Sequence, residues 1–511
     1  MGNPLKITDS IGIFSKLIIV IFALLGLLRL PRLPLFMDIY YHLPTAWGFL
    51  QAGGFSSWDF WEYAPLGRPH IYPPFFHLLL ALLMKLGFSV IFLAKFFESV
   101  TPVILLLVIW NFIRKNYDEQ LGFFVVVAFC SSFTFFTFLA NHVPVSLALI
   151  LGFLSLGELF KKRILRAVIL FSLCFYTHIS VCWFFFFSYC CYAILDKDRR
   201  WDLFRVVFYS FLVALPILFF ELLNLHFIHL IGNDFLWEFF LQVKVIDYIL
   251  AGLGLYWVVK MAPGYRLFIS LFLASFIYLS YLYRFITAEG YLPIVFLSAL
   301  TLQGIWQRIK AAKLWAKKAL MGVLILFVLL ISPTVILEKL PVSNKINTKI
   351  DWVDSVFSGI FLVKGDSIWY PRLYLPAVDI LKENSAKDDI VYSGINFSGV
   401  IMSALAQRAT ANAIFPEVRP AVELDPLAVA NIILLPKDLE EQFISSLILK
   451  YQLAKIRESE YFLIFRNPVP VYRLKIVKAV LSFPVIVSIF FLLGGLFWSE
   501  QLMKMFKKSK K

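Results

Sequence analysis

The chain has 511 residues, a formal net charge of +15, and a composition that is 60% apolar and 18% aromatic. A mean hydropathy of +0.80 excludes an ordinary soluble domain and indicates several bilayer spans. The Lys and Arg residues form short clusters between apolar runs and in the C-terminal tail, so the charge points to anionic lipid headgroups and not to nucleic acid. We therefore predict a polytopic α-helical membrane protein.

The five cysteines all lie inside apolar segments, and no two of them have Cys-x-x-Cys spacing. This pattern argues against a disulfide framework and against a zinc site of the Cys type.

The first apolar run, Ile11–Leu30, is long and lacks a small-residue cleavage site, so we expect a retained first span. Further apolar runs follow, and the one that contains His178 is long enough to fold back on itself there. Together the runs predict about twelve spans. The later runs are Phe97–Ile113, Leu121–Ala140, Pro144–Phe160, Ile164–Leu195, Leu203–Leu222, Ile246–Val259, Leu267–Tyr283, Tyr291–Trp306, Leu320–Leu337 and Ile476–Trp498.

The segment Tyr72–Leu86 decides the sidedness of the chain. It opens close to a Pro-Pro pair and is short for a span, so we expect it to lie along the interface. The basic clusters between spans then fall inside, both termini are cytoplasmic, and residues 35–95 form one external loop with interfacial helices. If the segment crosses the bilayer instead, the clusters Arg114-Lys115 and Lys161-Lys162-Arg163 fall outside.

The composition changes after residue 337, the end of the predicted membrane module 1–337. Over residues 338–473 the apolar runs shorten and polar residues return, which predicts a small external α/β domain with a mixed sheet. Within it, Leu439–Gln452 has the pattern of an amphipathic helix, and Leu453–Phe465 that of a hairpin turning at Glu458-Ser459. Residues 474–511 predict a final span and a basic cytoplasmic tail.

Ionisable residues gather among aromatic ones in the stretch Met37–His77. Polar chemistry concentrated between apolar segments indicates a site at the membrane face. Two structural interpretations compete with this one, namely a solvated loop and an aromatic belt at the headgroup level. A stretch that only connects two spans is typically short, which favours the site. The ionisable residues are Asp38, His42, Asp59, Glu62, Arg68, His70 and His77.

Three pieces of this loop resemble the first external loop of the GT-C superfamily of membrane glycosyltransferases. They are Asp-Ile-Tyr-Tyr-His-Leu at 38–43, Pro-Leu-Gly-Arg-Pro at 65–69 and Tyr-Pro-Pro-Phe-Phe at 72–76. The nearest likeness is to the catalytic subunit of oligosaccharyltransferase and its archaeal relatives. The resemblance implies transfer of a sugar from a polyprenyl-phosphate or polyprenyl-diphosphate carrier to an acceptor glycan, lipid or protein on the external face.

By the same resemblance, Asp38 stands where the family has an acidic residue that activates the acceptor or helps to hold a divalent cation, Mg or Mn. A carboxylate at the membrane surface suits either role, because it can accept a proton or coordinate a hard cation. From the residues alone, Asp38 suits equally well as the N-cap of a helix that begins near Tyr40, and a cap and a catalytic carboxylate are compatible.

The chain departs from the oligosaccharyltransferase pattern at two places. It contains no Trp-Trp-Asp-Tyr-Gly run, and the external turn where that family has a second acidic motif reads Asn141-His142-Val143-Pro144. Because this turn offers an imidazole in place of a carboxylate, the identity of a metal, and whether one is needed, stay open. Transfer to Asn in a protein sequon is not predicted, while a lipid-linked glycan, a surface polymer and a protein hydroxyl remain as acceptors.

The other polar residues are assigned by their places in the predicted topology. Arg284 ends a span on the external side, where a guanidinium suits a lipid phosphate; alternatively it reaches the headgroups and pairs with Glu289. Arg68 and His70 suit the same phosphate or the sugar, and a solvated turn is their structural alternative. The ligands predicted for the donor phosphate or substrate are Arg284, Arg68, His70, His42, Glu289 and Tyr283, and the accessory residues are His142, His178, Asp59 and Glu62. For His178 a hydrogen-bonded structural role is the main alternative.

Three functions from different classes compete. A glycosyltransferase of the cell membrane, with a polyprenyl-linked donor, explains both the ionisable loop and the absence of a nucleotide-phosphate motif. The alternative is a transporter or flippase of a lipid-linked glycan intermediate, but the ionisable residues crowd the external ends of spans and the two halves are not alike. A non-catalytic receptor or scaffold would leave the composition of the first loop unexplained. The sequence specifies neither the sugar nor the oligomeric state.

Overall fold

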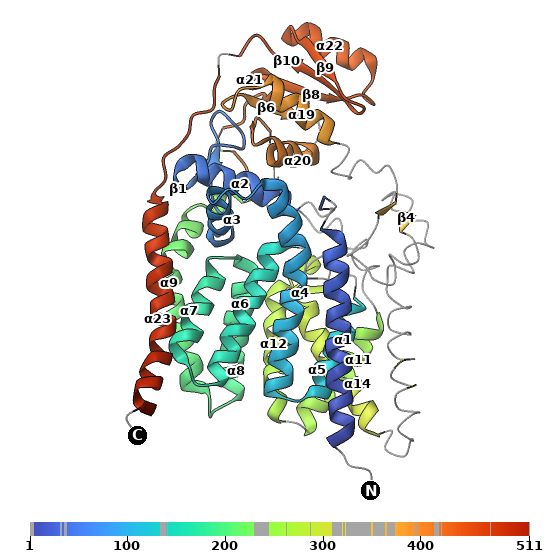
Figure 1. The fold of residues 1–511 in the computed structure, drawn as a ribbon, viewed down its shortest axis with the longest axis vertical. Helices are drawn as coiled ribbons and strands as arrows, with labels where there is room; N and C mark the ends of the chain where they lie inside the picture. The colour runs from blue at the N-terminus through green and yellow to red at the C-terminus, as the bar shows by residue number, and fades with distance from the viewer. Residues whose placement is uncertain are drawn as a thin grey trace. The chain divides into compact units, whose positions relative to one another are not determined.

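The structure is a computed structural model of residues 1–511, and Figure 1 shows its fold. It describes residues 5–30, 33–34, 38–132, 139, 142–228, 245–261, 263–286, 288–308, 319, 322, 349–350, 363–364, 374–393, 396–412, 418–420, 422–470 and 472–509. The predicted span Leu320–Leu337 and the predicted boundary at residue 337 therefore lie outside the described residues, apart from Gly322.

The chain forms two compact units. One comprises Met1–Pro31, Glu98–Leu215 and Gly232–Gly365, and the other comprises Arg32–Phe97, Pro216–Ile231 and Asp366–Lys511. The units are called here the helical unit and the mixed unit. The predicted external loop and the predicted α/β segment thus both belong to the mixed unit, although they are separated by most of the helical unit in the sequence.

The helical unit is a bundle of apolar helices, in which α6 packs on α7, α8 on α12, and α11 on α14 (Figure 1). A carboxylate marks the start of α5, since the Asp118 side chain accepts a hydrogen bond from the Leu121 amide at 2.7 Å. The helices are α1 Leu5–Arg29, α4 Val90–Asn116, α5 Glu119–Cys130, α6 Val143–Phe160, α7 Ile164–Phe175, α8 Ile179–Leu195, α9 Arg200–Leu223, α11 Val245–Met261, α12 Arg266–Ser275, α13 Leu282–Ile286 and α14 Tyr291–Arg308, with α4 and α9 continuing into the mixed unit. Short 3-10 turns, η4 Pro263–Tyr265 and η5 Phe276–Tyr278, and the strands β4 Lys349–Ile350 and β5 Val363–Lys364 complete the described elements.

Several predicted runs map directly onto these helices. The break predicted at His178 is confirmed, because α7 ends at Phe175 and α8 begins at Ile179. The run Leu267–Tyr283, in contrast, is not one helix: α12 ends at Ser275, whose hydroxyl donates a hydrogen bond to the Phe272 carbonyl at 2.6 Å. Such back-bonding competes with the helical ladder and favours an end or a bend.

Four helices among the described residues are long and apolar enough to cross a bilayer, and further apolar helices are shorter. The first three are Val90–Asn116, Val143–Phe160 and Arg200–Leu223, and the fourth is the stretch Arg284–Arg308, which contains α14. The predicted count of about twelve spans is therefore neither reached nor refuted by the described helices.

The mixed unit contains a five-stranded sheet of order β7-β6-β8-β10-β9. Strand β6 runs parallel to β7 and β8, whereas β10 runs antiparallel to β8 and β9. The predicted amphipathic helix and hairpin are confirmed as α22, β9 and β10. The elements of this stretch are α19 Leu375–Asn384, β6 Ile390–Ser393, α20 Asn396–Ala406, β7 Ala409–Thr410, α21 Pro426–Val429, β8 Ile432–Pro436, α22 Glu441–Tyr451, β9 Ala454–Glu458, β10 Phe462–Arg466, β11 Leu481–Ser482 and α23 Phe483–Ser509.

The last predicted span begins later than expected. Residues 472–479 have no regular secondary structure, and α23 starts only at Phe483 and continues to Ser509. The cause is pairing of this segment with the first loop, where Gly54 lies opposite Ser482 and Phe55 opposite Leu481. Gly54 permits the close approach, since a Cβ at this position would lie 2.0 Å from the Leu481 carbonyl oxygen.

The remaining elements of the mixed unit come from the first loop and from residues 225–227. Helix α3 has 11 residues, which is short for a bilayer span and agrees with the expectation for Tyr72–Leu86. The elements are α2 Asp38–Ala52, β1 Gly54–Phe55, β2 Trp58–Asp59, β3 Arg68–Pro69, α3 Phe75–Lys85 and η2 Leu225–Phe227.

Candidate functional site

Asp38 lies in the first turn of α2, where the N-terminal end of the helix dipole favours a carboxylate. Its side chain is 16% exposed. His42 lies one turn later on the same face, and its Nε2 atom is 3.3 Å from Oδ2 of Asp38. The described part of α2 thus includes Asp38 in its first turn.

His42 also contacts a second histidine. Its Nδ1 atom lies 2.8 Å from Nε2 of His77, which is carried by α3, and both side chains are fully buried. Helices α2 and α3 pack against each other, and Phe76 and Tyr72 surround the pair with their rings. Burial lowers the pKa of His77 well below its usual value, and the neighbouring His42 and His70 add to this effect while Asp38 opposes it. His77 is therefore neutral near pH 7.

Sequence reasoning counted His77 among the ionisable residues of the loop but gave it no role. The sequence indicated only that His77 lies near the start of a helix, because it follows the Pro-Pro pair at 73–74. Only the packing of α2 on α3 shows that His42 and His77, which are 35 residues apart, meet.

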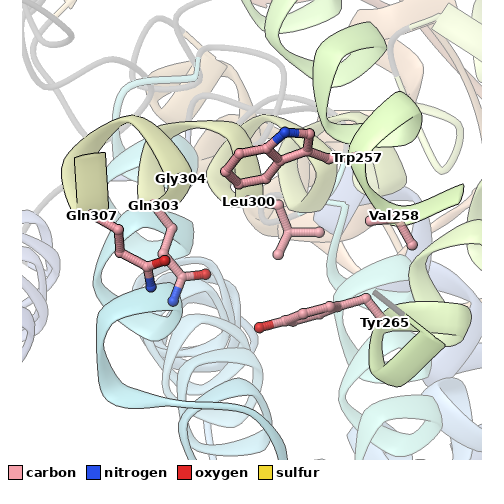
Figure 2. A pocket seen from close by; sticks show the side chains of 7 residues that line it. All are labelled: Trp257, Val258, Tyr265, Leu300, Gln303, Gly304 and Gln307. Carbon is pink, nitrogen blue, oxygen red and sulfur yellow. The ribbon is translucent and has the colours of Figure 1, made fainter. Parts of the chain in front are cut away.

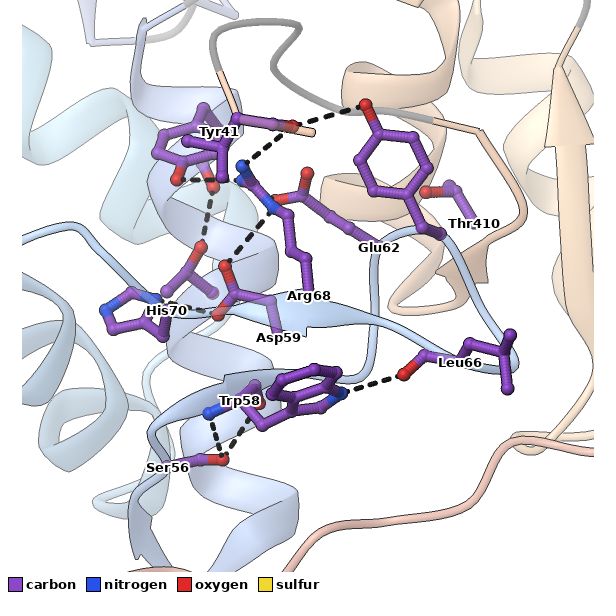
Figure 3. Close-up of polar contacts among 12 residues, drawn as sticks. Tyr41, Ser56, Trp58, Asp59, Glu62, Leu66, Arg68, His70 and Thr410 are labelled. Carbon is purple, nitrogen blue, oxygen red and sulfur yellow. Dashed lines mark hydrogen bonds and ion pairs between the residues drawn. The ribbon is translucent and has the colours of Figure 1, made fainter. Parts of the chain in front are cut away.

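Arg68 is the centre of a second buried network in the mixed unit (Figure 3). Its NH2 atom is 2.8 Å from Oε1 of Glu62, and its Nε atom is 3.5 Å from Oδ2 of Asp59. Asp59 lies opposite Arg68 in the β2–β3 pair and is also 2.7 Å from Nδ1 of His70. Burial lowers the pKa of Arg68, but the charges of Glu62, Tyr41 and Asp59 outweigh it and hold that pKa above its ordinary value.

This network joins the first loop to the segment around Val418. The Val418 carbonyl accepts hydrogen bonds from Arg68 and from the Tyr63 hydroxyl, both at 3.3 Å. The Thr410 amide donates to the Trp61 carbonyl, and the Thr410 carbonyl accepts from the Ala64 amide. These contacts tie two stretches more than 340 residues apart in the sequence into one unit.

The solvated-turn interpretation of Arg68 and His70 is wrong, because each side chain is only 1% exposed. A buried guanidinium between two carboxylates is compensated within the protein, so a substrate could reach Arg68 only after the loop moved. The assignment of Arg68, His70, Asp59 and Glu62 to substrate contacts stays a prediction.

Arg284 occupies a different environment in the helical unit. Its NH1 atom lies 2.8 Å from Oε1 of Glu289, which is fully buried, while the Arg284 side chain is 22% exposed. The Ser180 hydroxyl donates to the same Glu289 oxygen at 2.7 Å, and the Tyr278 hydroxyl donates to the Ser180 carbonyl, also at 2.7 Å. The predicted pairing of Arg284 with Glu289 is confirmed.

A tight turn between α13 and α14 brings this pair together. The Gly290 amide donates to the Arg284 carbonyl at 3.0 Å, and a Cβ on Gly290 would lie 2.0 Å from the Phe285 carbonyl oxygen. The side chain of Tyr283, also predicted as a ligand, lies outside the described residues.

The accessory histidines have structural positions. His178 is the N-cap of α8, and its ring Nδ1 accepts from the Val181 amide at 3.3 Å, as the structural alternative predicted. His142 is the N-cap residue of α6 and is half-buried. These positions do not show a catalytic role for either histidine, so their accessory roles stay predictions.

The metal site implied by the resemblance is not assembled by the residues that the structure describes. Among them, no group of three or more His, Cys, Asp or Glu side chains is arranged to hold a metal ion. Asp38 is an apt oxygen ligand, but Nδ1 of its neighbour His42 is engaged by His77, and no third ligand stands beside Asp38 and His42 among the described residues. The described residues therefore do not assemble a metal centre.

A separate cavity of about 230 Å³ lies in the helical unit (Figure 2). Trp257 and Val258 of α11, Tyr265 of η4, and residues of α14 line it, with the Gln303 amide donating to the Asp118 carboxylate at 2.8 Å. None of the predicted site residues lines this cavity. Its lining is Trp257, Val258, Tyr265, Leu300, Gln303, Gly304 and Gln307.

Comparisons with known proteins identify the fold. No protein-family model matches the chain, and no curated protein matches it in sequence. The crystal structure of ArnT from Cupriavidus metallidurans in the apo state matches with a TM-score of 0.58 and 10% identity, over 89% of this chain and 98% of that chain. The same protein bound to undecaprenyl phosphate matches with a TM-score of 0.55 and 12% identity, with the same coverage.

An archaeal structure matches as well. The oligosaccharyltransferase of Archaeoglobus fulgidus in complex with Zn and sulfate has a TM-score of 0.53 and 12% identity, over 89% of this chain and 75% of that chain. ArnT and the archaeal protein are both GT-C glycosyltransferases. The resemblance predicted from the first loop is thus confirmed at the level of the fold, over most of the chain, and the apolar helices together with these neighbours indicate a membrane protein.

Proposed function

We propose that this chain, which has the fold of GT-C membrane glycosyltransferases, transfers a sugar from a polyprenyl-phosphate carrier to a hydroxyl acceptor on the external face of the membrane. The observation that carries the proposal is the match to ArnT over 89% of the chain, including a state of ArnT bound to undecaprenyl phosphate. The ionisable first loop, with Asp38 at the start of α2, supplies the chemistry that such a transfer needs.

Asp38 is the proposed general base. The acceptor oxygen forms a bond to the anomeric carbon of the sugar while its proton passes to the Asp38 carboxylate. The bond between the anomeric carbon and the donor phosphate oxygen breaks, and polyprenyl phosphate leaves with the bonding electrons. A partly exposed carboxylate suits this role, because the acceptor can reach it and the helix terminus favours its ionised form.

Arg284 is the proposed ligand of a donor phosphate. The buried Glu289 carboxylate orients the guanidinium of Arg284. The Arg284 side chain is still 22% exposed, so a ligand can reach it. Guanidinium groups match phosphate oxygens in geometry and stay charged at all physiological pH values. Ser180 donates a hydrogen bond to Glu289 and is itself hydrogen-bonded to Tyr278, so both residues support Arg284 indirectly.

The test uses the full chain in membranes with a panel of undecaprenyl- and dolichyl-phosphate-linked hexoses and pentoses. We expect consumption of one donor and release of free polyprenyl phosphate, and a loss of about 10²- to 10⁴-fold in rate for Asp38→Asn. Asp202→Asn is the matched control, because Asp202 also lies in the first turn of its helix and is 27% exposed. Its rate should stay within about twofold of the parent, since surface charge changes have small effects.

Two outcomes would contradict the proposal. Full activity of Asp38→Asn would show that Asp38 is not the general base. Movement of the labelled carrier across vesicle membranes without any consumption of donor would instead establish the transporter or flippase alternative.

A further inference from the structure

The pair His42 and His77 lies directly behind the proposed base. Oδ2 of Asp38 lies at ion-pair distance from Nε2 of His42, 3.3 Å, although this nitrogen makes no hydrogen bond among the described residues, and Nδ1 of His42 is hydrogen-bonded to Nε2 of His77 at 2.8 Å. Carboxylate, imidazole and imidazole thus form an uninterrupted series from a partly exposed residue into the interior, where both rings are fully buried.

The contacts favour one arrangement of protons on the two rings. An ionised carboxylate only accepts hydrogen bonds, so it is complementary to His42 protonated at Nε2. Neutral His42 in this tautomer has a lone pair at Nδ1, which requires a donor, and Nε2–H of His77 is the atom in place. Neutral His77 then has its lone pair at Nδ1, an atom that is buried and has no hydrogen-bond partner among the described residues.

The neutral form of His77 is consistent with its surroundings. Its ring lies against Phe49, with centroids 5.9 Å apart, and against His70, with centroids 5.4 Å apart. Burial lowers its pKa, the adjacent His42 and His70 lower it further, and Asp38 opposes this effect only in part. A neutral His77 can donate one hydrogen bond and has one acceptor site, as the tautomer assignment needs.

We propose that His77 is a positioning residue for Asp38: by donating to Nδ1 of His42 it fixes the His42 tautomer that carries its proton at Nε2, the ring nitrogen that lies 3.3 Å from the carboxylate. This inference rests on the proposed function for its catalytic consequence, but the tautomer itself can be observed without any reaction. His42 and His77 do not touch the substrate in this scheme. They hold the base in one orientation and keep it ionised, as the outer hydrogen-bond partners of active-site groups commonly do.

Amide side chains of two lengths test this geometry. The amide nitrogen of Gln can occupy the place of Nε2 of a histidine, whereas the amide nitrogen of Asn occupies the place of Nδ1. We expect His77→Asn and His77→Leu to lower kcat about 10- to 100-fold, with donor KM changed by less than about threefold, and His77→Gln to restore most of kcat. Phe49→Leu is the control, since it removes a ring packed on His77 and His70 but no hydrogen bond.

A spectroscopic measurement keeps the test independent of activity. The chain contains seven histidines, so ¹⁵N NMR of the protein labelled at imidazole nitrogens gives few signals, and His42 and His77 are assigned by their loss in His42→Gln and His77→Gln. We expect both rings to be neutral and protonated at Nε2 at pH 7, and the His42 signals to shift in His77→Leu but not in Phe49→Leu.

Protonation of His42 at Nδ1 in the parent protein would overturn the proposal, and so would equal kcat values for His77→Asn and His77→Gln in samples with equal folded fractions. Asp38→Asn measured in parallel separates the two claims. If it is inactive while His77→Asn keeps full kcat, only the positioning role fails. If it is fully active, the proposed base fails, whatever His77 does.

Discussion

Arg68 and Arg284 each form an ion pair with a buried glutamate, at the same distance of 2.8 Å, but in two different environments. Arg68 is 1% exposed and is also contacted by Asp59, Tyr41 and the Val418 carbonyl. Arg284 is 22% exposed and lies in the short helix α13, just before the turn into α14. The Arg68–Glu62 pair therefore belongs to a buried network that joins two distant stretches of the chain, whereas the Arg284–Glu289 pair leaves part of a guanidinium exposed.

The comparison separates two uses of an arginine that sequence patterns do not distinguish. A fully buried guanidinium stabilises the fold chiefly because its carboxylate partners would otherwise be buried without compensation. A partly exposed guanidinium can be oriented by its carboxylate and still reach a ligand. Replacing each arginine should therefore affect different quantities, the free energy of unfolding for Arg68 and the affinity for the donor for Arg284.

The largest effect is expected for Arg68→Leu. This change leaves Glu62 buried without its cation and Asp59 with His70 as a remaining partner, which should lower the free energy of unfolding by about 3–5 kcal/mol. The measurement is thermal unfolding of the purified protein in detergent. Arg68→Lys should lose less, because it keeps a charge but cannot reach Glu62, Asp59 and the Val418 carbonyl together.

The control for this prediction is the same substitution in the other environment. Arg284→Leu should destabilise less than Arg68→Leu, because Glu289 keeps the hydrogen bond from Ser180, whereas Glu62 and Asp59 both lose their contact with Arg68. Equal losses of stability for the two leucine variants would show that exposure does not separate the two arginines.

A smaller effect is expected for Arg284→Lys. The lysine keeps a charge opposite Glu289 but loses the planar set of donors that matches a phosphate, so donor KM should rise about tenfold while the melting temperature stays nearly unchanged. The measurement is transfer from a polyprenyl-phosphate-linked sugar at varied donor concentration. An unchanged KM would show that Arg284 is no phosphate ligand, and Arg308→Lys at the far end of α14 is the matched control.

Local patterns predicted the pairing of Arg284 better than the burial of Arg68. Arg284 and Glu289 are five residues apart, so a single turn brings them together and the sequence shows both. Arg68 depends on Tyr41, 27 residues away, and on Val418, 350 residues away, and no local pattern contains such separations. The same reason explains why His77 was given no role and why the start of α23 was placed too early.

Predictions of helix ends in the apolar runs also depended on whether the local sequence shows the cause. The break at His178 was predictable, because a polar residue interrupts an apolar run and can cap the helix that follows. The end of α12 at Ser275 was not, because a serine inside an apolar run is compatible with a continuous helix. The resemblance to the GT-C superfamily came from the short first-loop motifs, and the fold confirmed it although identity to the matched structures is only 10–12%.

The smallest effect is expected for Ser180→Ala, which tests whether Arg284 is oriented through Glu289. The change removes the hydroxyl that donates to the Glu289 carboxylate and is paired with Tyr278, and a hydrogen bond to a charged group is worth about 1.5–3 kcal/mol. Because Arg284 still compensates the carboxylate, we expect a loss near the lower end of that range in unfolding free energy and a rise of about threefold in donor KM. Ser270→Ala is the matched control, since that buried serine donates only to a carbonyl of its own helix. If Ser180→Ala lowers the melting temperature as Ser270→Ala does but leaves donor KM unchanged, the serine stabilises the helical unit without orienting the arginine, and Glu289 alone sets the direction of the guanidinium.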